Sequence, residues 1–397
     1  MDMVGAVRRM WRDQTALALA IAVGAATASA ADPLPKWTPG TLDIHQINTG
    51  LGNAALVMLP DGTTLLIDAG DRVNVPPRAT PPRPDASRPA GAWIARYARA
   101  TGATAIDYAL LTHFHDDHMD ALPDVAEGIP IRTLLDRGWP DYAFPSADHA
   151  EFKRPGFVRY REYVKSGRMR VERLMPGRSD QIVPRVDPKA YPQLEVRNVA
   201  ANGEIWTGTG TETRSRFPPL ATLAREDWPT ENMCSLGIRL RYGRFDYYSG
   251  GDIPGLPRPG YPEWQDIETP VAQAVGAVDV AVLNHHGNRD STNPFFVSTL
   301  RPRLWIIPVW SSDHPGYDVL DRMYSARLYP DSRDVFATNM LDANKIVIGP
   351  LLDRLLSSQG HIVIRVSKGG DSYQVLILDD TAESYTVKAT HGPYEAR

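Results

Sequence analysis

The stretch IDYALLTHFHDDH, residues 106–118, passes from an apolar run directly into histidines and aspartates. The apolar part predicts a buried β-strand. His113 and His115, two residues apart on extended backbone, project the same way, whereas Asp117 and His118 lie on the turn that follows. A chance cluster on a solvated loop is the alternative, but an apolar strand leading into it favours a rigid site. The spacing therefore predicts that two metal ions share one strand end.

A metal site needs more ligands than one turn supplies, and two other predicted strands end in suitable residues. Asp252 follows the run 245–251, whose final glycines let the backbone turn sharply. Its carboxylate can bridge two cations, although an isolated turn aspartate more commonly caps its own backbone. His285 and His286 follow the apolar run 279–284. Ligand types at three strand ends favour one shared site.

Short strands separated by turns dominate the rest of the chain. Strands are predicted at 42–48, 54–59, 63–68, 106–112, 236–242, 245–249, 278–283, 304–309, 362–366 and 373–378. Helices are predicted at 92–100, 267–275, 295–300 and 319–328. The segment 138–230 contains several prolines and shows little periodicity, so we interpret it as an irregular insertion.

The composition excludes several classes of protein. The chain has 397 residues, 43% of them hydrophobic, with a net charge of -4 and one cysteine. This length allows a sizeable core, and a single thiol excludes a disulfide scaffold or a cysteine zinc finger. The near-neutral charge gives no bulk electrostatic reason for tight duplex binding. We expect Cys234 to be a small buried hydrophobe.

The first thirty residues have the pattern of a secretory signal. Arginines within 8–12 precede an uncharged, mostly apolar run at 15–27, and 28–30 read Ala-Ser-Ala, a small-residue cleavage site. A transmembrane anchor is the alternative, but the run is shorter than the roughly 18 to 20 residues that a bilayer needs. We therefore expect a signal peptide at 1–30, one hydrolase domain at 31–397, and a periplasmic or secreted product without a membrane anchor.

The His-x-His-x-Asp-His pattern of 113–118, followed by Asp252 and the paired histidines, resembles the metallo-β-lactamase superfamily. The nearest likeness is to the extracytoplasmic hydrolase domain of competence-type DNA-uptake channel proteins. Further matching stretches lie at 42–44, 48–54, 60–70, 232–235 and 313–315. The resemblance runs from about 42 to 328, fails over 138–230, and does not include the family's membrane channel. It implies an α/β (α+β) fold, a four-layer αβ/βα sandwich of two mixed sheets between helices.

The resemblance also implies a set of metal ligands. They are His113, His115, Asp117, His118, Asp252 and His285. His113 and His115 would hold one metal. Asp117 and His118 would hold the other, together with one histidine of the pair 285–286. Asp252 would bridge the two metals. We favour His285 as that histidine because it comes first after the strand, leaving His286 to orient it or to meet substrate.

The catalytic residues that the resemblance implies are Asp117, His286 and His314. His314 would lie at the rim of the site and face the substrate or donate a proton. Its alternative is a loop histidine beside a proline.

One position departs from the family pattern. Many dinuclear members place a third histidine for the first metal about four residues before the serine that corresponds to Ser235, where this chain has Glu231 and Asn232. An oxygen ligand from either would favour manganese as well as zinc. His149 is a more distant candidate. The expected cofactors are two divalent ions, zinc or manganese. Whether both metal sites are filled depends on the ligand supplied at 231–232.

Metal-assisted hydrolysis fits the rest of the sequence. A divalent ion lowers the pKa of bound water toward about 7, so the water can attack an ester, lactone, amide or phosphodiester at neutral pH. No G-x-S-x-G elbow points to a serine nucleophile. We expect an exported metal-dependent hydrolase acting on phosphodiesters. The alternatives are a β-lactam or lactone hydrolase and a non-catalytic binding module on the same fold.

The expected partner is a small-molecule or polymer substrate, with nucleic acids among the candidates. The acidic net charge opposes binding of a polyanion, but a local basic face would offset it. That face would consist of Arg154, Arg159, Arg161, Lys165, Arg168 and Arg170.

Overall fold

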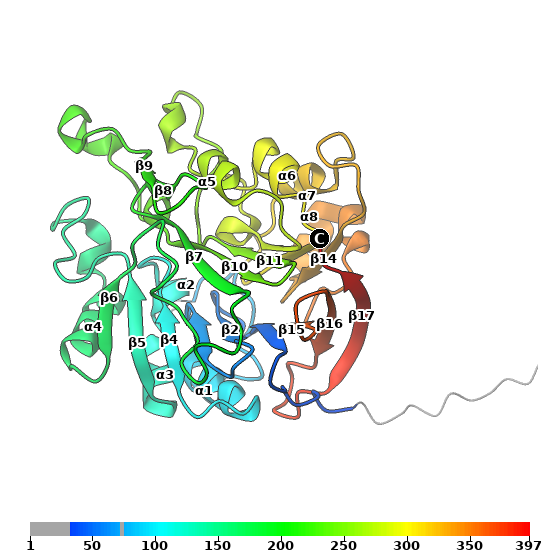
Figure 1. Ribbon diagram of the computed structural model, residues 1–397. Helices are drawn as coiled ribbons and strands as arrows, with labels where there is room; N and C mark the ends of the chain where they lie inside the picture. Colours follow the sequence, from blue (N-terminus) through cyan, green and yellow to red (C-terminus); the bar gives the residue numbers. More distant parts are fainter. Residues whose placement is uncertain (1–31, 72–74) are drawn as a thin grey trace, which may run out of the picture.

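Two mixed β-sheets pack face to face, with helices on their outer faces, in the computed structural model (Figure 1). The structure describes residues 32–71 and 75–397, so the expected signal peptide at 1–30 lies outside the described residues. The α/β four-layer sandwich predicted from the sequence is confirmed. Within those ranges, no helix combines the length and apolar character needed to cross a bilayer.

The first sheet has nine strands in the order β17-β16-β15-β1-β2-β3-β4-β5-β6. In chain order they are β1 (Leu42–Gln46), β2 (Ala55–Met58), β3 (Thr64–Ile67), β4 (Ile106–Leu110), β5 (Ile131–Asp136), β6 (Arg170–Arg173), β15 (His361–Val366), β16 (Ser372–Leu378) and β17 (Val387–Glu395). The strands from β3 to β6 run parallel to one another.

The second sheet has eight strands in the order β14-β13-β12-β11-β10-β7-β8-β9. In chain order they are β7 (Leu194–Ala201), β8 (Glu204–Trp206), β9 (Thr213–Ser215), β10 (Gly237–Tyr242), β11 (Phe245–Ser249), β12 (Val280–Val282), β13 (Leu304–Ile307) and β14 (Asp334–Ala337). The strands from β11 to β14 are parallel.

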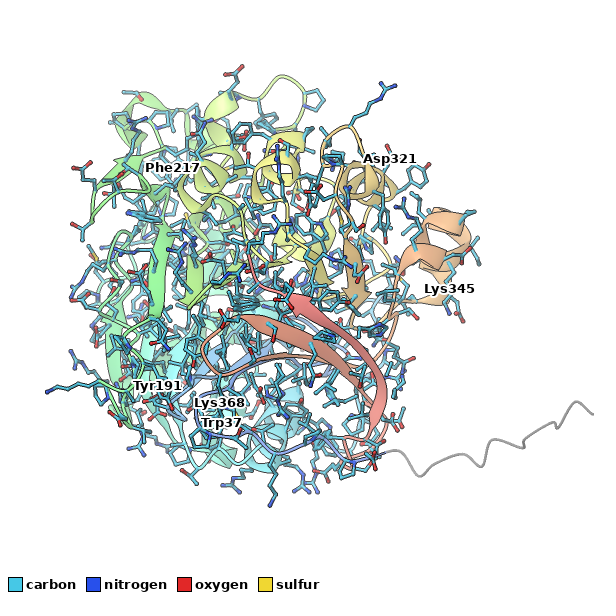
Figure 2. The ribbon with its side chains drawn as sticks, turned by 45° about the vertical axis from the view of Figure 1, so that its right-hand side comes forward. Trp37, Tyr191, Phe217, Asp321, Lys345 and Lys368 are labelled. Atoms are coloured by element: carbon cyan, nitrogen blue, oxygen red, sulfur yellow. The ribbon has the colours of Figure 1, made fainter. Side chains whose placement is uncertain are left out.

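Helices cover the two outer faces (Figures 1 and 2). They are α1 (Ala90–Ala100), α2 (Asp116–Met119), α3 (Leu122–Gly128), α4 (Pro155–Lys165), α5 (Glu268–Val275), α6 (Pro294–Leu300), α7 (Tyr317–Tyr324) and α8 (Asp342–Ile348). Apolar residues of α1, α3 and α4 pack on the first sheet, and those of α5, α6 and α7 pack on the second.

Side chains that alternate along each strand form the apolar layers on both faces of the sheets. In β3, Leu65 and Ile67 point into the core between the sheets, whereas Leu66 packs with Ile94 of α1 on the outer face. Successive side chains of a strand point to opposite faces, so a fully apolar strand serves two cores at once. This explains why β2 and β3 read as continuous apolar runs.

Parallel pairing decides where the site lies. Neighbouring parallel strands place their carboxyl ends at the same edge of a sheet. Asp68 follows β3 and His113 follows β4 in the first sheet, whereas Asp252, His286 and His314 follow β11, β12 and β13 in the second. The two sheets therefore bring these five residues to one end of the sandwich.

The ten predicted strands and four predicted helices are confirmed, with shifts at their ends. The segment 138–230 is more regular than expected. It contributes β6 to the first sheet, β7, β8 and β9 to the second, and α4 to the outer layer. Its longest strand, β7, pairs antiparallel with β10. That pairing supplies a partner from a distant part of the chain, which local periodicity does not report.

Candidate metal centre

Two groups of ligand atoms meet where the strands of both sheets end, and they share Asp252. In the first group, His113 Nε2 lies 3.1 Å from His115 Nδ1 and 3.7 Å from Asp252 Oδ2. The ligand atoms of each group lie within 4.8 Å of one another. The strand end after β4 thus presents two imidazoles to one side of Asp252.

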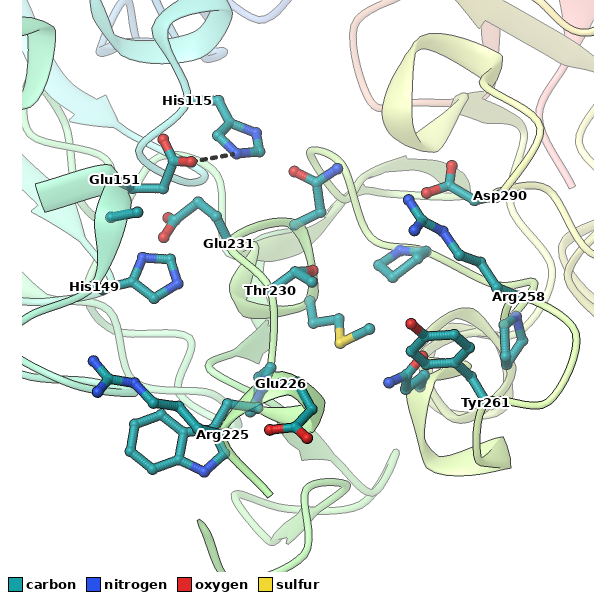
Figure 3. Close-up of a pocket in the computed structure, with 18 of the residues that line it drawn as sticks. His115, His149, Glu151, Arg225, Glu226, Thr230, Glu231, Arg258, Tyr261 and Asp290 are labelled. Atoms are coloured by element: carbon teal, nitrogen blue, oxygen red, sulfur yellow. Dashed lines mark ion pairs between the residues drawn. The ribbon is translucent and has the colours of Figure 1, made fainter. Parts of the chain in front are cut away.

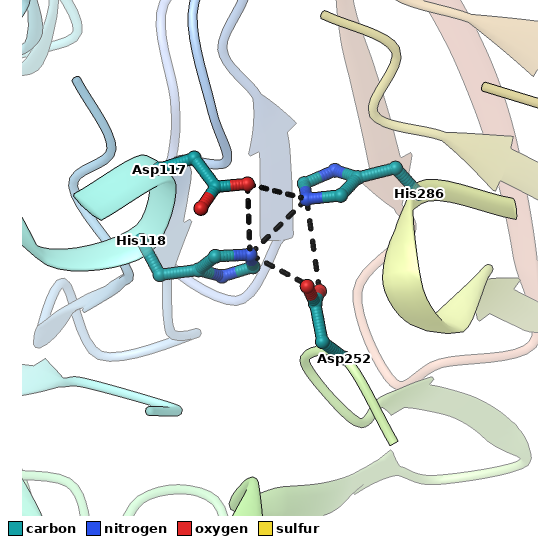
Figure 4. A group of neighbouring side chains, drawn as sticks. All are labelled: Asp117, His118, Asp252 and His286. Carbon is teal, nitrogen blue, oxygen red and sulfur yellow. Dashed lines mark hydrogen bonds and ion pairs between the residues drawn. The ribbon is translucent and has the colours of Figure 1, made fainter. Parts of the chain in front are cut away.

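The second group contains Asp117, His118, Asp252 and His286 (Figure 4). His118 Nε2 lies 3.1 Å from His286 Nε2 and 3.1 Å from Asp252 Oδ1. His286 Nε2 lies 3.3 Å from Asp117 Oδ2. All four side chains are buried, and Figure 4 shows them pointing toward a common centre.

This donor set fits two divalent cations. Asp252 turns Oδ2 toward the first group and Oδ1 toward the second, the arrangement of a bridging carboxylate. Although Oδ1 is buried, it accepts no hydrogen bond, and a buried polar atom of this kind calls for a partner. Imidazole and carboxylate donors without a thiolate suit zinc, iron or manganese.

Hydrogen bonds fix which nitrogen of the buried histidines faces the centre. His118 Nδ1 lies 2.7 Å from Asp68 Oδ2, and His286 Nδ1 lies 2.8 Å from the Pro308 carbonyl oxygen. Because both oxygens accept hydrogen bonds, each Nδ1 carries a proton and each Nε2 is the nitrogen that faces the centre.

Asp68 is a functional residue that the sequence reasoning did not single out. Its carboxylate accepts hydrogen bonds from the Thr112 amide, the Thr112 hydroxyl and Asn53 Nδ2, besides contacting His118. Its backbone is left-handed, with φ of 60°, a strained conformation that recurs at functional sites. The available signal was a carboxylate directly after a buried strand, the same signal that identified Asp252.

The sequence model of the metallo-β-lactamase superfamily matches residues 47–198, the part of the chain that carries the histidine-rich turn. This part of the chain belongs to that superfamily. The buried histidine and aspartate centre that accompanies this match has the ligand types of a metal-dependent hydrolase. No curated protein matches the chain.

Several solved structures are similar to this chain. The di-iron β-hydroxylase CmlA of Streptomyces venezuelae shares 14% identity at a TM-score of 0.40, and the match covers 83% of this chain but only 55% of that one. The metallo hydrolase Igni18 of Ignicoccus hospitalis shares 12% identity at a TM-score of 0.38, covering 81% and 98%. The metallo-β-lactamase SMB-1 shares 13% at a TM-score of 0.33, covering 64% and 80%. These distant likenesses assign neither substrate nor metal.

Burial and local charge set the protonation of the candidate ligands. Burial opposes charge on Asp252, but His118 and the other facing imidazoles outweigh it and hold the pKa of this carboxyl well below its ordinary value. Burial lowers the pKa of His113 far enough to keep it neutral. Burial also opposes charge on His118, yet Asp252 and Asp68 raise its pKa well above the ordinary value. Cations therefore meet ionised carboxylates and must displace a proton from His118.

The structure places the two histidines of the pair the other way round from our expectation. His286, not His285, lies in the second ligand group. His285 Nδ1 lies 2.6 Å from Asp290 Oδ1, and its Nε2 lies 3.7 Å from Asp252 Oδ2. Both histidines lie in η6 (Asn284–Gly287) with positive φ, 48° and 54°. These left-handed residues turn the chain back, so the second imidazole reaches the centre and the first faces outward.

His314 lies behind His286 and is not at an open rim. Its ring stacks on His286 with centroids 4.9 Å apart, and Trp310 meets it edge-on. The residue is only 3% exposed. Burial, and then the neighbouring His286, lower the pKa of His314 to about 3. It is a neutral support for the His286 ring in this arrangement.

Glu231 is engaged elsewhere than at the first metal. Its carboxylate accepts hydrogen bonds from the Phe114 amide and from the buried guanidinium of Arg137. Asn232 Nδ2 lies 3.3 Å from His285 Nε2. Within the described ranges, no further histidine joins the first ligand group, and His149 lines the adjacent pocket instead. The first group thus offers two imidazoles and the shared carboxylate.

A pocket of about 700 Å³ opens beside the centre (Figure 3). His115 and His285 form its inner wall. Residues of the segment 138–230 form one side, and residues 254–265, which follow β11, form the other. A substrate group held in this pocket would lie next to the shared Asp252.

Proposed function

We propose that the chain is an exported phosphodiesterase that uses two divalent ions, zinc or manganese. The observation that carries the proposal is the sharing of Asp252 by two ligand groups, each of which offers imidazole and carboxylate donors. Paired divalent ions, when bound, would stabilise the attacking and leaving oxygens of an in-line displacement and lower the pKa of a water molecule.

The protein's own residues would position these ions and the substrate. Asp252 and Asp117 supply negative charge at the centre, and Asp68 and the Pro308 carbonyl hold the imidazoles of His118 and His286 in place. His285 faces the pocket with its Nδ1 held by Asp290. We assign His285 to contact with the substrate, the role first given to His286.

Most basic side chains of the expected basic face are paired with carboxylates in the structure. Four of its six residues pair with carboxylates: Arg154 with Asp116, Arg159 with Asp124, Arg168 with Glu127 and Arg170 with Glu172. Paired guanidinium groups contribute little net positive charge to a surface. The proposed substrate is therefore a small phosphodiester or a strand end that enters the pocket, in preference to a long duplex.

Export rests on the sequence pattern of residues 1–30, and the resemblance to the hydrolase domain of DNA-uptake proteins supports a phosphodiester substrate. The periplasm or the medium is the proposed location. Fractionation of cells that make the full chain, with detection of the cleaved N-terminus beginning at Ala31, tests this part. A product that keeps residues 1–30 in the cytoplasm would contradict it.

Turnover tests the reaction. Residues 31–397, loaded with zinc or manganese, should hydrolyse bis(p-nitrophenyl) phosphate, and nitrocefin and a simple lactone should be poorer substrates. Asp252→Ala should abolish turnover, and Asp342→Ala, at a side chain that is 91% exposed, should leave it unchanged. Hydrolysis of only nitrocefin or the lactone would contradict this proposal and favour the alternative, a β-lactam or lactone hydrolase. Metal binding without any turnover would favour a binding module.

A further inference from the structure

Phe114 separates the two histidines of the first ligand group, and it is held by both its backbone and its ring. Its amide donates a hydrogen bond to Glu231 Oε1 over 2.8 Å. The guanidinium of Arg137 lies over its ring, 4.6 Å from the ring centroid. Because His113 and His115 flank this residue, a displacement of Phe114 would move both imidazoles.

Arg137 and Glu231 form a buried ion pair. Each side chain is 1% exposed. Arg137 Nε lies 2.7 Å from Glu231 Oε1, and Arg137 Nη2 donates to the other carboxylate oxygen, so the pair is bidentate. A guanidinium and a carboxylate joined in this way fix each other's direction. The acceptor that holds the Phe114 amide is therefore itself fixed.

Partners from the segment 138–230 hold the other side of the guanidinium. Arg137 Nη1 donates to Asn202 Oδ1 over 3.0 Å and to the Phe144 carbonyl oxygen over 3.2 Å. Asn202 Nδ2 donates in turn to the carbonyl oxygen of Arg137 over 2.8 Å. The ion pair thus connects the end of β5, the segment 138–230 and the turn after β4 that carries the ligands.

Stability by itself does not account for this ion pair. Removing two charges from water is costly, and exchange of a buried ion pair for apolar residues of similar volume is often neutral or stabilising. The ring of Phe114 already packs against three other aromatic rings, Tyr142, Phe157 and Tyr160, whose centroids lie 5.0 to 5.7 Å away. What the pair adds is a directional contact with one backbone amide.

The first ligand group depends more on accurate placement than the second. It offers two imidazoles and the shared carboxylate of Asp252, whereas the second group offers four side chains. Asp68 and the Pro308 carbonyl oxygen also hold the imidazoles of the second group directly. A site with few donors binds its ion only when each donor is held close to the required geometry.

We propose that Arg137 and Glu231 are positioning residues for the ion of the first ligand group. They fix Phe114, and through it the directions of His113 and His115. Position 231 thus acts on this ion through the backbone and not as a ligand. The proposal rests on the two-ion centre of the proposed function and adds how the first ion is held.

Zinc binding to metal-free residues 31–397 tests the proposal without any substrate. Competition with a chromophoric chelator gives two dissociation constants, and His113→Ala identifies the first ion as the one whose constant it raises most. Arg137→Met with Glu231→Leu replaces the ion pair by apolar side chains. It should raise the first constant by roughly tenfold or more, as for other residues behind metal ligands, and leave the second nearly unchanged.

Two further variants separate positioning from support of the fold. Arg137→Met with Glu231→Gln keeps an acceptor for the Phe114 amide without a buried charge, so it should recover part of the lost affinity. Arg137→Lys keeps the charge but loses the bidentate geometry, so it should give an intermediate loss. It also applies the same test if the apolar variant does not fold. The absorption spectrum of cobalt-loaded protein should change in the apolar variant and approach that of wild type in the variant with Gln.

Asp43→Leu with Arg365→Met is the matched control, because it removes another buried carboxylate and its arginine. Arg365 Nη2 lies 2.6 Å from Asp43 Oδ2. Both β1 and β3 pair antiparallel with β2, so they run in the same direction. Asp43, near the amino end of β1, therefore lies at the end of the sheet away from the centre. This control should leave both constants within about twofold of wild type, as expected for a distant site.

Three outcomes would overturn the proposal. They are variants of the ion pair that weaken both ions equally or neither, a loss of the first ion that also occurs in the control, and a wild type that binds a single ion. The result is separable from that of the proposed function. Selective loss of the first ion, in a protein that hydrolyses no phosphodiester, would keep the positioning role and overturn the proposed reaction. Phosphodiester turnover without selective loss would do the reverse.

Discussion

Asp68 links the backbone of one strand end to the imidazole of His118, which belongs to the second ligand group. It accepts hydrogen bonds from Thr112 and orients His118, whose other nitrogen faces Asp252. His286 is oriented in the same way by a carbonyl oxygen, that of Pro308. At this scale the site depends on acceptors behind the ligands as much as on the ligands themselves.

Replacement of Asp68 should weaken metal binding without removing a ligand. Asp68→Asn loses the charge that favours Nδ1–H on His118, and outer partners of this kind are worth about 10- to 100-fold in metal affinity. Competition with a chromophoric chelator measures the change, with the exposed Asp342→Asn as the control. An unchanged affinity for both ions would show that Asp68 has only a structural role.

The two histidines of the pair should respond differently to removal. His286→Ala should lose one of the two bound ions, because His286 Nε2 lies among the second ligand group. His285→Ala should keep both ions and raise KM, since His285 faces the pocket. Metal content by mass spectrometry, measured beside steady-state kinetics, decides between them. Loss of an ion only in His285→Ala would restore the assignment favoured by the sequence.

At the scale of elements, α5 holds the turn that carries these histidines. Glu268, in the first turn of α5, accepts hydrogen bonds from Asn284 Nδ2 and from the amides of Thr292 and Asn293. The residue is fully buried and its partners are neutral, so burial raises the pKa of Glu268 to about 8. One carboxyl group thus ties a helix to η6 and to the loop that follows it.

This buried carboxyl group predicts a pH dependence of stability. The ordinary pKa of Glu268 is 4.5 and the folded-state pKa is about 8, so between these values the folded protein keeps a proton that the unfolded chain releases. The free energy of unfolding should therefore fall as pH rises through this window and change no further from this group above it. Urea midpoints of metal-free protein at pH about 5 and about 8.5 measure the fall, which should be smaller in Glu268→Gln. The histidine contributions are common to both proteins, so equal slopes would exclude Glu268 as a source.

At the scale of the whole molecule, the centre connects the two halves of the sandwich. Asp117 and His118 follow β4 of the first sheet, whereas Asp252 and His286 follow strands of the second. Without cations, only hydrogen bonds and ion pairs join these buried groups. Bound ions would cross-link the sheets at the end where the pocket opens.

Chelation should therefore lower Tm. Ligands that bind only the folded state add about 4 kcal/mol at a free concentration of 1,000 times their Kd. Thermal unfolding with EDTA and with excess zinc or manganese should differ by several degrees in the wild type. Asp252→Ala, which removes the shared carboxylate, should show a much smaller difference. Equal responses of the two proteins would place the stabilising ions elsewhere.

The strand ends and the kinds of ligand could be predicted from the amino-acid sequence alone. His113 and His115 sit two residues apart on one strand end, and extended backbone sends such residues to the same side, so local geometry was sufficient. Asp252 was found in the same way, from a strand followed by glycines. The apolar runs of the two sheets also predicted most strands, because burial on both faces leaves a continuous apolar signal.

Which groups become partners depended on the packing of the two sheets and could not be predicted from local sequence. It joined Glu231 to Arg137, placed Asp68 behind His118, and brought His286 to the centre in place of His285. It also gave β7 a partner in β10. The reason is physical: local spacing fixes the direction of a side chain along its own strand. The distance between segments far apart in the sequence is set only when the two sheets pack against each other.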